Sequence, residues 1–143
     1  PVAYEKNAVV RDAVNSGDVA LGLVNHYYLF EKIAAEGASA VVAKNHYFTN
    51  GDIGGLVNVA GVGMLQSSKN QKSTLALINY LLSSAGQEYF AQKSFEYPLV
   101  AGIAQYAELP ALADLNSPNI DLSDLKSIAL TQEMLEEVGL LTK

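Results

Sequence analysis

Two adjacent tyrosines are the residues of this sequence best suited to chemistry. Tyr27 and Tyr28 follow Asn25 and His26 at the point where the apolar run 19–24 gives way to a helical pattern. A phenol has a pKa of about 10 and is normally neutral, but a bound cation displaces its proton and the positive end of a helix favours the resulting charge. Phenolate oxygens match hard, highly charged cations such as ferric iron. The pair therefore predicts a metal site with Tyr27 and Tyr28 as ligands.

The same two tyrosines can also have a purely structural role in packing. Tyrosines at a helix start commonly pack through their rings and use the hydroxyl for one hydrogen bond. His26 and His46 each stand beside a tyrosine, so a mixed His/Tyr site is conceivable, although a lone histidine is more often a polar surface residue. The residue types alone do not decide between packing and metal binding.

Two asparagines suggest an anion beside the metal. Asn7 and Asn25 each precede an apolar helical pattern, and both are interpreted as N-caps. Two helix N-termini directed at one place would form an anion cradle from backbone N–H groups, with the amide side chains as further donors. Each asparagine can also be a cap and nothing more.

The elements that would position these residues alternate between helix and strand. Apolar spacing predicts helices over 7–15, 26–36, 85–93 and 131–138, with Gly17, Gly37 and Gly139 as stops and Thr131 as a cap. A longer helix begins within 67–70, and its predicted buried stripe consists of Leu75, Leu77, Ile78, Leu81 and Leu82. Strands are predicted over 19–24, 40–48 and 56–65, and residues 99–120 are expected to be irregular. This order predicts an α/β fold.

Composition narrows the class of protein. The chain has 143 residues, half of them apolar, which suffices for one domain with a core. Its 9 Lys and Arg against 15 Asp and Glu give a net charge of -6, so nucleic acid and anionic membranes are poor partner candidates. Cysteine is absent, which excludes thiolate ligands. Because the chain opens on Pro1 without an initiator Met, we expect a processed or truncated product whose export signal would lie upstream.

Enzyme motifs are missing from the sequence. It contains no G-x-S-x-G, no H-E-x-x-H, no Walker A motif and no dinucleotide fingerprint. An enzyme that uses a tyrosine as acid or base would need a perturbed partner group, and the sequence offers no candidate.

Several segments together resemble one family. They are Asn7, the run 13–18, Asn25 to Tyr28, the run 51–58 (GDIGGLVN), the run 65–71 (LQSSKNQ) and the run 96–99 (EYPL). In this order they are similar to the ferric-iron-binding solute receptors of bacterial ABC transporters, and the resemblance extends along essentially the whole chain.

The resemblance implies a function for each candidate residue. Tyr27 and Tyr28 match the paired tyrosines that bind Fe(III), and Asn7 and Asn25 match positions that hold phosphate or carbonate in some members. His26 occupies a position that is not a ligand. The family implies a non-enzymatic receptor that delivers iron to an ABC permease, in the periplasm or, as a lipoprotein, at the extracellular face of the membrane. The alternative is a receptor of the same fold for thiamine, a polyamine or an oxyanion.

The family also implies an architecture larger than this chain. Its members are type II periplasmic-binding-protein-like receptors with two lobes, and the chain resembles their C-terminal half. Residues 1–58 and 109–143 would belong to the C-terminal lobe, and 59–108 would cross into the N-terminal lobe. The N-terminal half would supply further His, Glu or Tyr ligands. We therefore expect the chain alone to expose apolar surface, to self-associate or to pair with the missing half.

Overall fold

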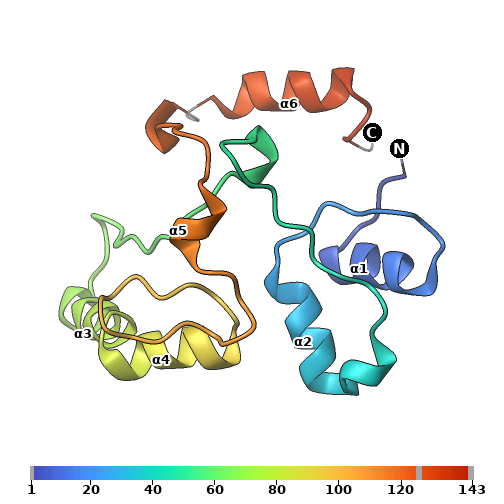
Figure 1. Ribbon diagram of the computed structural model, residues 1–143. Helices are drawn as coiled ribbons and strands as arrows, with labels where there is room; N and C mark the ends of the chain where they lie inside the picture. The colour runs from blue at the N-terminus through green and yellow to red at the C-terminus, as the bar shows by residue number, and fades with distance from the viewer. Residues whose placement is uncertain (1, 125–126, 142–143) are drawn as a thin grey trace. The chain divides into compact units, whose positions relative to one another are not determined.

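Helices are the regular elements of this chain. The computed structural model describes residues 2–124 and 127–141. Its helices, labelled in Figure 1, are α1 (Asn7–Ser16), α2 (Tyr27–Glu36), α3 (Gln71–Leu81), α4 (Ser84–Lys93), α5 (Leu112–Leu115) and α6 (Ile128–Glu137), with 3-10 turns at Ala38–Ala40, Ile53–Gly55 and Leu122–Asp124. Within those described ranges, no helix has the length and apolar character needed to cross a lipid bilayer.

The chain divides into two compact units. The first consists of Pro1–His46 with Pro118–Lys143, and it contains α1, α2 and α6. The second is Tyr47–Ser117 and contains α3, α4 and α5.

Glycines end the first two helices as predicted. Gly17 lies in the left-handed region at φ 85°, and its N–H bonds to the carbonyls of Ala13 and Val14. Gly37 has φ 88° and bonds to the carbonyl of Ile33. Only glycine adopts such backbone angles without steric cost. The helices at the start of the chain are therefore confirmed to within one residue of the expected bounds.

Both asparagine caps were predicted wrongly. The cap of α1 is Lys6, whose backbone is extended (φ -144°, ψ 143°), and Asn7 is the first helical residue. An N-cap needs non-helical backbone, and here that break falls one residue before Asn7. At α2 the cap is His26, which already has helical angles, and Asn25 uses its side chain elsewhere.

The predicted strands are extended segments without a partner strand. Within the described ranges no residue is assigned to a β-strand, so the structure does not confirm the α/β class. In 41–48 the residues alternate between half-buried and exposed, as they do along one face of a sheet. Leu21, Leu23 and Val42 are 76%, 73% and 72% exposed. The period-2 pattern is present, but a strand also needs a neighbour to which its N–H and C=O groups can bond.

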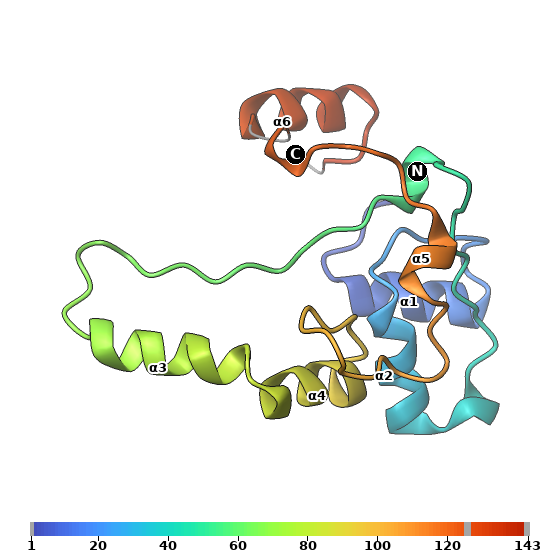
Figure 2. The ribbon, with the colours of Figure 1, turned by 60° about the vertical axis from the view of Figure 1, so that its left-hand side comes forward.

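Tight packing in the second unit centres on α4. Ser83 caps this helix by accepting from the N–H of Gly86 at 3.3 Å. The buried Gln87 donates to the Leu81 carbonyl at 2.9 Å and accepts from the N–H of Leu99 at 2.7 Å. Its amide therefore ties the α3–α4 junction to the loop that follows α4, and Figure 2 shows α3 and α4 end to end.

The predicted buried stripe of α3 is wrong. Leu75, Leu77 and Leu82 are exposed, while Ile78 and Leu81 are half-buried. The helix forms because Gln, Lys, Ala and Leu favour helical backbone and the apolar spacing is that of an amphipathic helix, but no described part of the second unit covers that face. The predicted cap of the last helix was also placed too late, because Ser127 caps α6 by accepting from the N–H of Leu130.

Candidate functional site

The two predicted ligands are the first two residues of α2, and their rings lie against each other. The ring centroids of Tyr27 and Tyr28 are 4.6 Å apart, with the planes tilted by 35°. Consecutive side chains of a helix normally point in different directions, so this approach is a specific feature of the helix start. Both residues are half-buried. The two rings are therefore neither sealed in the core nor separated from each other.

Asn25 contacts the pair directly. Its Nδ2 donates to the Tyr27 hydroxyl oxygen at 3.1 Å. An amide N–H directed at a phenol oxygen stabilises the negative charge of a phenolate. The His26 ring meets the edge of the Tyr27 ring at a centroid distance of 5.8 Å. Asn25 thus belongs to the site, as a partner of Tyr27 and not as a helix cap.

The turn that carries the tyrosines is held from a distant segment. The Asn45 side chain donates to the His26 carbonyl at 2.9 Å. Asn15 accepts from the backbone N–H groups of Val42 and Ala43, at 2.8 and 3.1 Å, and so ties the same extended segment to α1. Asn45 therefore holds the residue before α2, and Asn15 holds the segment that carries Asn45.

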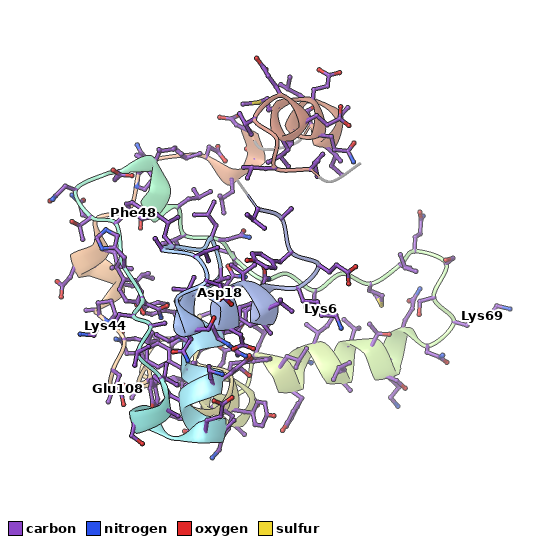
Figure 3. The ribbon with its side chains drawn as sticks, turned by 90° about the vertical axis from the view of Figure 1, so that its right-hand side faces the viewer. Lys6, Asp18, Lys44, Phe48, Lys69 and Glu108 are labelled. Carbon is purple, nitrogen blue, oxygen red and sulfur yellow. The ribbon has the colours of Figure 1, made fainter. Side chains whose placement is uncertain are left out.

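A pocket of about 400 Å³ joins Tyr28 to the start of α1. It is lined by Tyr4, Glu5, Lys6, Asn7, Ala8 and Tyr28. The first N–H groups of α1 have no intrahelical acceptor, and the helix dipole makes this end positive. The exposed Lys6, labelled in Figure 3 at the start of α1, adds a cationic side chain to the rim. The structure therefore brings Asn7 and Tyr28 together, and it places Asn25 on the neighbouring Tyr27.

Arg11 connects α1 to the tyrosine turn and was not predicted. Its Nη1 donates to the backbone carbonyl of Tyr28 at 3.0 Å. Its Nε and Nη2 both contact Asp12 Oδ1 at 3.0 Å. The available signals were that Arg11 is the only arginine of the sequence and lies four residues, about one helical turn, after Asn7.

An ion pair of Lys32 also joins α1 and α2. Lys32 Nζ lies 3.0 Å from Asp12 Oδ1 and 2.8 Å from Glu36 Oε1. The Arg11 guanidinium, with a smaller effect from Lys32, lowers the pKa of Asp12 against the opposing effect of burial. Glu36 and then Asp12 raise the pKa of Lys32. The folded first unit thus favours the charged forms of Asp12 and Lys32.

The described residues offer no cluster of carboxylates and histidines that could serve as another metal site. In 2–124 and 127–141, no three His, Asp or Glu side chains gather closely enough to hold a metal ion. His46 is exposed in the extended segment after α2.

Comparison with known proteins places these observations in context. No protein-family model matches the chain. It is 37% identical over 97% of its length to the Fe(3+)-binding periplasmic protein of Serratia marcescens. It is 27% identical over 96% to the major ferric iron-binding protein of Neisseria meningitidis serogroup B, and 30% identical over 90% to iron uptake protein A1 of Synechocystis.

The matched region is only part of each relative. The chain covers 41% of the Serratia and Neisseria proteins and 37% of the Synechocystis protein. Three relatives from different bacteria nevertheless agree over at least 90% of this chain, and all three are named for iron. The chain is therefore similar, along nearly its whole length, to part of the ferric-iron-binding proteins of several bacteria.

Proposed function

We propose that the protein containing this chain is an extracytoplasmic Fe(III) receptor that delivers iron to an ABC permease. The observation that carries this proposal is the 37% identity, over 97% of the chain, to a protein named for binding Fe(3+) in the periplasm. The names of the relatives describe binding and uptake, so the proposed function is transport and not catalysis.

Tyr27 and Tyr28 are the proposed iron ligands. Their rings lie 4.6 Å apart at the start of α2, which supports binding of one cation by both oxygens. The metal would displace both phenol protons, because a trivalent cation stabilises phenolate far more than water does. The Asn25 amide, 3.1 Å from the Tyr27 oxygen, supports the charged form.

Asn7 and Asn25 are the proposed contacts of a synergistic anion, phosphate or carbonate. Asn7 lines the pocket that Tyr28 shares with the positive end of α1. An anion there would lie beside the iron and offset part of its charge. Asn25 does not line this pocket, so its proposed contact with the anion depends on the metal-bound arrangement of the tyrosines.

The proposed architecture is a two-lobed receptor with the iron in the cleft between lobes. Residues 1–58 and 109–143 would form part of the C-terminal lobe, and 59–108 would cross into the other lobe. The exposed Leu21, Leu23 and Val42 support a larger fold, because partner strands and helices of an α/β lobe would cover such residues. The remaining iron ligands would come from the rest of the protein.

A second candidate is a receptor of the same fold for an anion without iron. The observation in its favour is the pocket at the positive end of α1, with Lys6 at its rim. Such a receptor would bind phosphate or another oxyanion and carry no stoichiometric metal.

One experiment separates the two candidates. The intact protein is stripped with a chelator, incubated with ferric nitrilotriacetate or with phosphate alone, desalted and analysed for iron and for its melting temperature. We expect one iron per protein and a higher melting temperature with ferric iron, because a ligand at 100 times its dissociation constant stabilises by about 2.7 kcal/mol. Zinc is the control cation. An iron content near zero, with stabilisation by phosphate alone, would favour the anion receptor.

A further inference from the structure

We propose that Arg11 is a positioning residue of this site, which holds the tyrosine pair in place relative to Asn7. The inference rests on the proposed function. Arg11 would not contact the iron or the anion. Its effect would pass through the backbone of Tyr28.

The guanidinium of Arg11 joins two elements with two sets of contacts. Nη1 donates to the Tyr28 carbonyl at 3.0 Å, and Nε and Nη2 contact Asp12 at 3.0 Å. The Arg11 side chain is only 13% exposed. A planar guanidinium presents its donors in a fixed fork, so fixing it on Asp12 also fixes the direction of the bond to Tyr28.

Arg11 lies on the face of α1 that also carries Asn7, so its bond to Tyr28 affects the distance between the tyrosines and Asn7. Asn7 and Arg11 are four residues apart, so they lie on the same face of α1. Tyr28 lines the pocket together with Asn7 and offers its carbonyl to Arg11. The Arg11 bond therefore sets where the first turn of α2 lies along that face, and with it the position of both phenols next to the start of α1.

The Arg11–Tyr28 hydrogen bond has a different effect from the ion pair that also joins α1 and α2. Lys32 on α2 already reaches Asp12 on α1 at 3.0 Å, so the helix pair has an ionic link that does not involve the tyrosine turn. The Arg11–Tyr28 bond acts on the turn that bears the ligands. A lysine at position 11 would keep the positive charge. Its single ammonium could not bond to Asp12 through two nitrogens and also donate to the Tyr28 carbonyl in the same geometry.

The test compares three variants of the intact protein. Iron affinity is measured by competition with citrate, the tyrosinate-to-iron absorption maximum is recorded at saturating iron, and stability is measured by urea unfolding of the iron-free form. For Arg11→Met we expect affinity to fall roughly 10- to 100-fold, the range typical of residues that orient metal ligands, together with a shifted absorption maximum. Arg11→Lys should give an intermediate loss.

Lys32→Met is the matched control. It removes the ionic link between α1 and α2 and leaves the Arg11–Tyr28 bond in place, so it should lower stability while leaving affinity within about twofold and the absorption maximum unchanged. Equal affinity losses in Arg11→Met and Lys32→Met, or unchanged affinity and spectrum in both Arg11 variants, would overturn the positioning role while the wild type still binds iron. A wild-type protein that binds no ferric iron would instead refute the proposed function, and this inference with it.

Discussion

The ring centroids of Tyr27 and Tyr28 are 4.6 Å apart although the two residues are neighbours in one helix. Successive residues of an α-helix are rotated by about 100°, so their side chains usually diverge. At the start of α2 the Tyr27 oxygen is held by Asn25 and the Tyr28 carbonyl by Arg11. The two phenol rings therefore lie side by side at the start of α2, and the proposed iron site depends on this arrangement.

Replacing either tyrosine by phenylalanine should weaken iron binding without unfolding the protein. Tyr27→Phe and Tyr28→Phe each keep the ring packing and delete one oxygen ligand. Loss of a direct ligand should exceed the roughly 10- to 100-fold effect of an outer partner. Iron competition with citrate measures the affinity, and urea unfolding of the iron-free variants provides the control. Variants that bind iron like the wild type would exclude these residues as ligands.

Asp12 should make the first unit sensitive to acid. Arg11 holds the pKa of Asp12 in the folded state below its usual value. The carboxylate therefore stabilises the folded state fully at a pH above the usual, unfolded pKa of an Asp side chain. The stabilisation is lost as the pH falls through the lower pKa of the folded state. Asp12→Asn should therefore be less stable at neutral pH and should lose less stability in acid than the wild type. Urea unfolding from neutral pH into the acid range measures both curves, and parallel curves would contradict the prediction.

Tyr97 should make the second unit sensitive to alkali. Burial, with a smaller effect from Tyr47, raises the pKa of Tyr97 to about 12. A raised phenol pKa means that stability is complete below the unfolded value of about 10 and is lost as the pH rises toward about 12. Its hydroxyl also donates to the Pro110 carbonyl at 2.7 Å.

The variant Tyr97→Phe tests both effects. It should lower stability at neutral pH by about 1 kcal/mol, the usual net value of one hydrogen bond. The loss of stability should not be larger, because the Pro110 carbonyl keeps a hydrogen bond from Gln105 at 3.1 Å and is not left without a partner. The alkaline decrease should become shallower, and circular dichroism during urea unfolding at several pH values measures it. An unchanged alkaline slope would show that Tyr97 is not the titrating group.

Replacing Gly86 by alanine should destabilise the protein, because there is no room for a Cβ atom. A Cβ added there would meet the backbone carbonyl oxygen of Tyr80 and would lie 2.8 Å from that of Leu81. Alanine normally stabilises a helix by about 1 kcal/mol relative to glycine, so a destabilised Gly86→Ala would show that packing dominates. We expect a loss of about 1–3 kcal/mol in urea unfolding. Gly61→Ala, where a Cβ meets open space, is the control and should be nearly neutral.

The sequence predicted the helices better than it predicted their surroundings. Gly17 and Gly37 end α1 and α2 where expected, because a left-handed backbone is a local requirement that only glycine meets easily. The strands and the buried face of α3 depend on partners distant in sequence or outside this chain, so local apolar spacing could not show whether they would be covered. Residues such as Leu75 and Leu77 are exposed for this reason.

The candidate site was predicted in part for the same physical reason. Tyr27 and Tyr28 are adjacent in sequence, so their common place at the start of α2 could be predicted, but the close approach of their rings could not. Arg11 is 17 residues from Tyr28, and its bond forms only because α1 packs beside α2. Asn7 and Asn25 lie beside the tyrosines, but their assignment as caps was wrong because each cap lies one residue away from the predicted position.

Visible absorption of the intact protein during titration with ferric nitrilotriacetate tests the central claim most directly. We predict a tyrosinate-to-iron band that rises to a plateau at one equivalent of iron and that is absent from the Tyr27→Phe/Tyr28→Phe double variant. A colourless wild-type protein at saturating iron, or a double variant with the full band, would contradict iron binding by this pair of phenols.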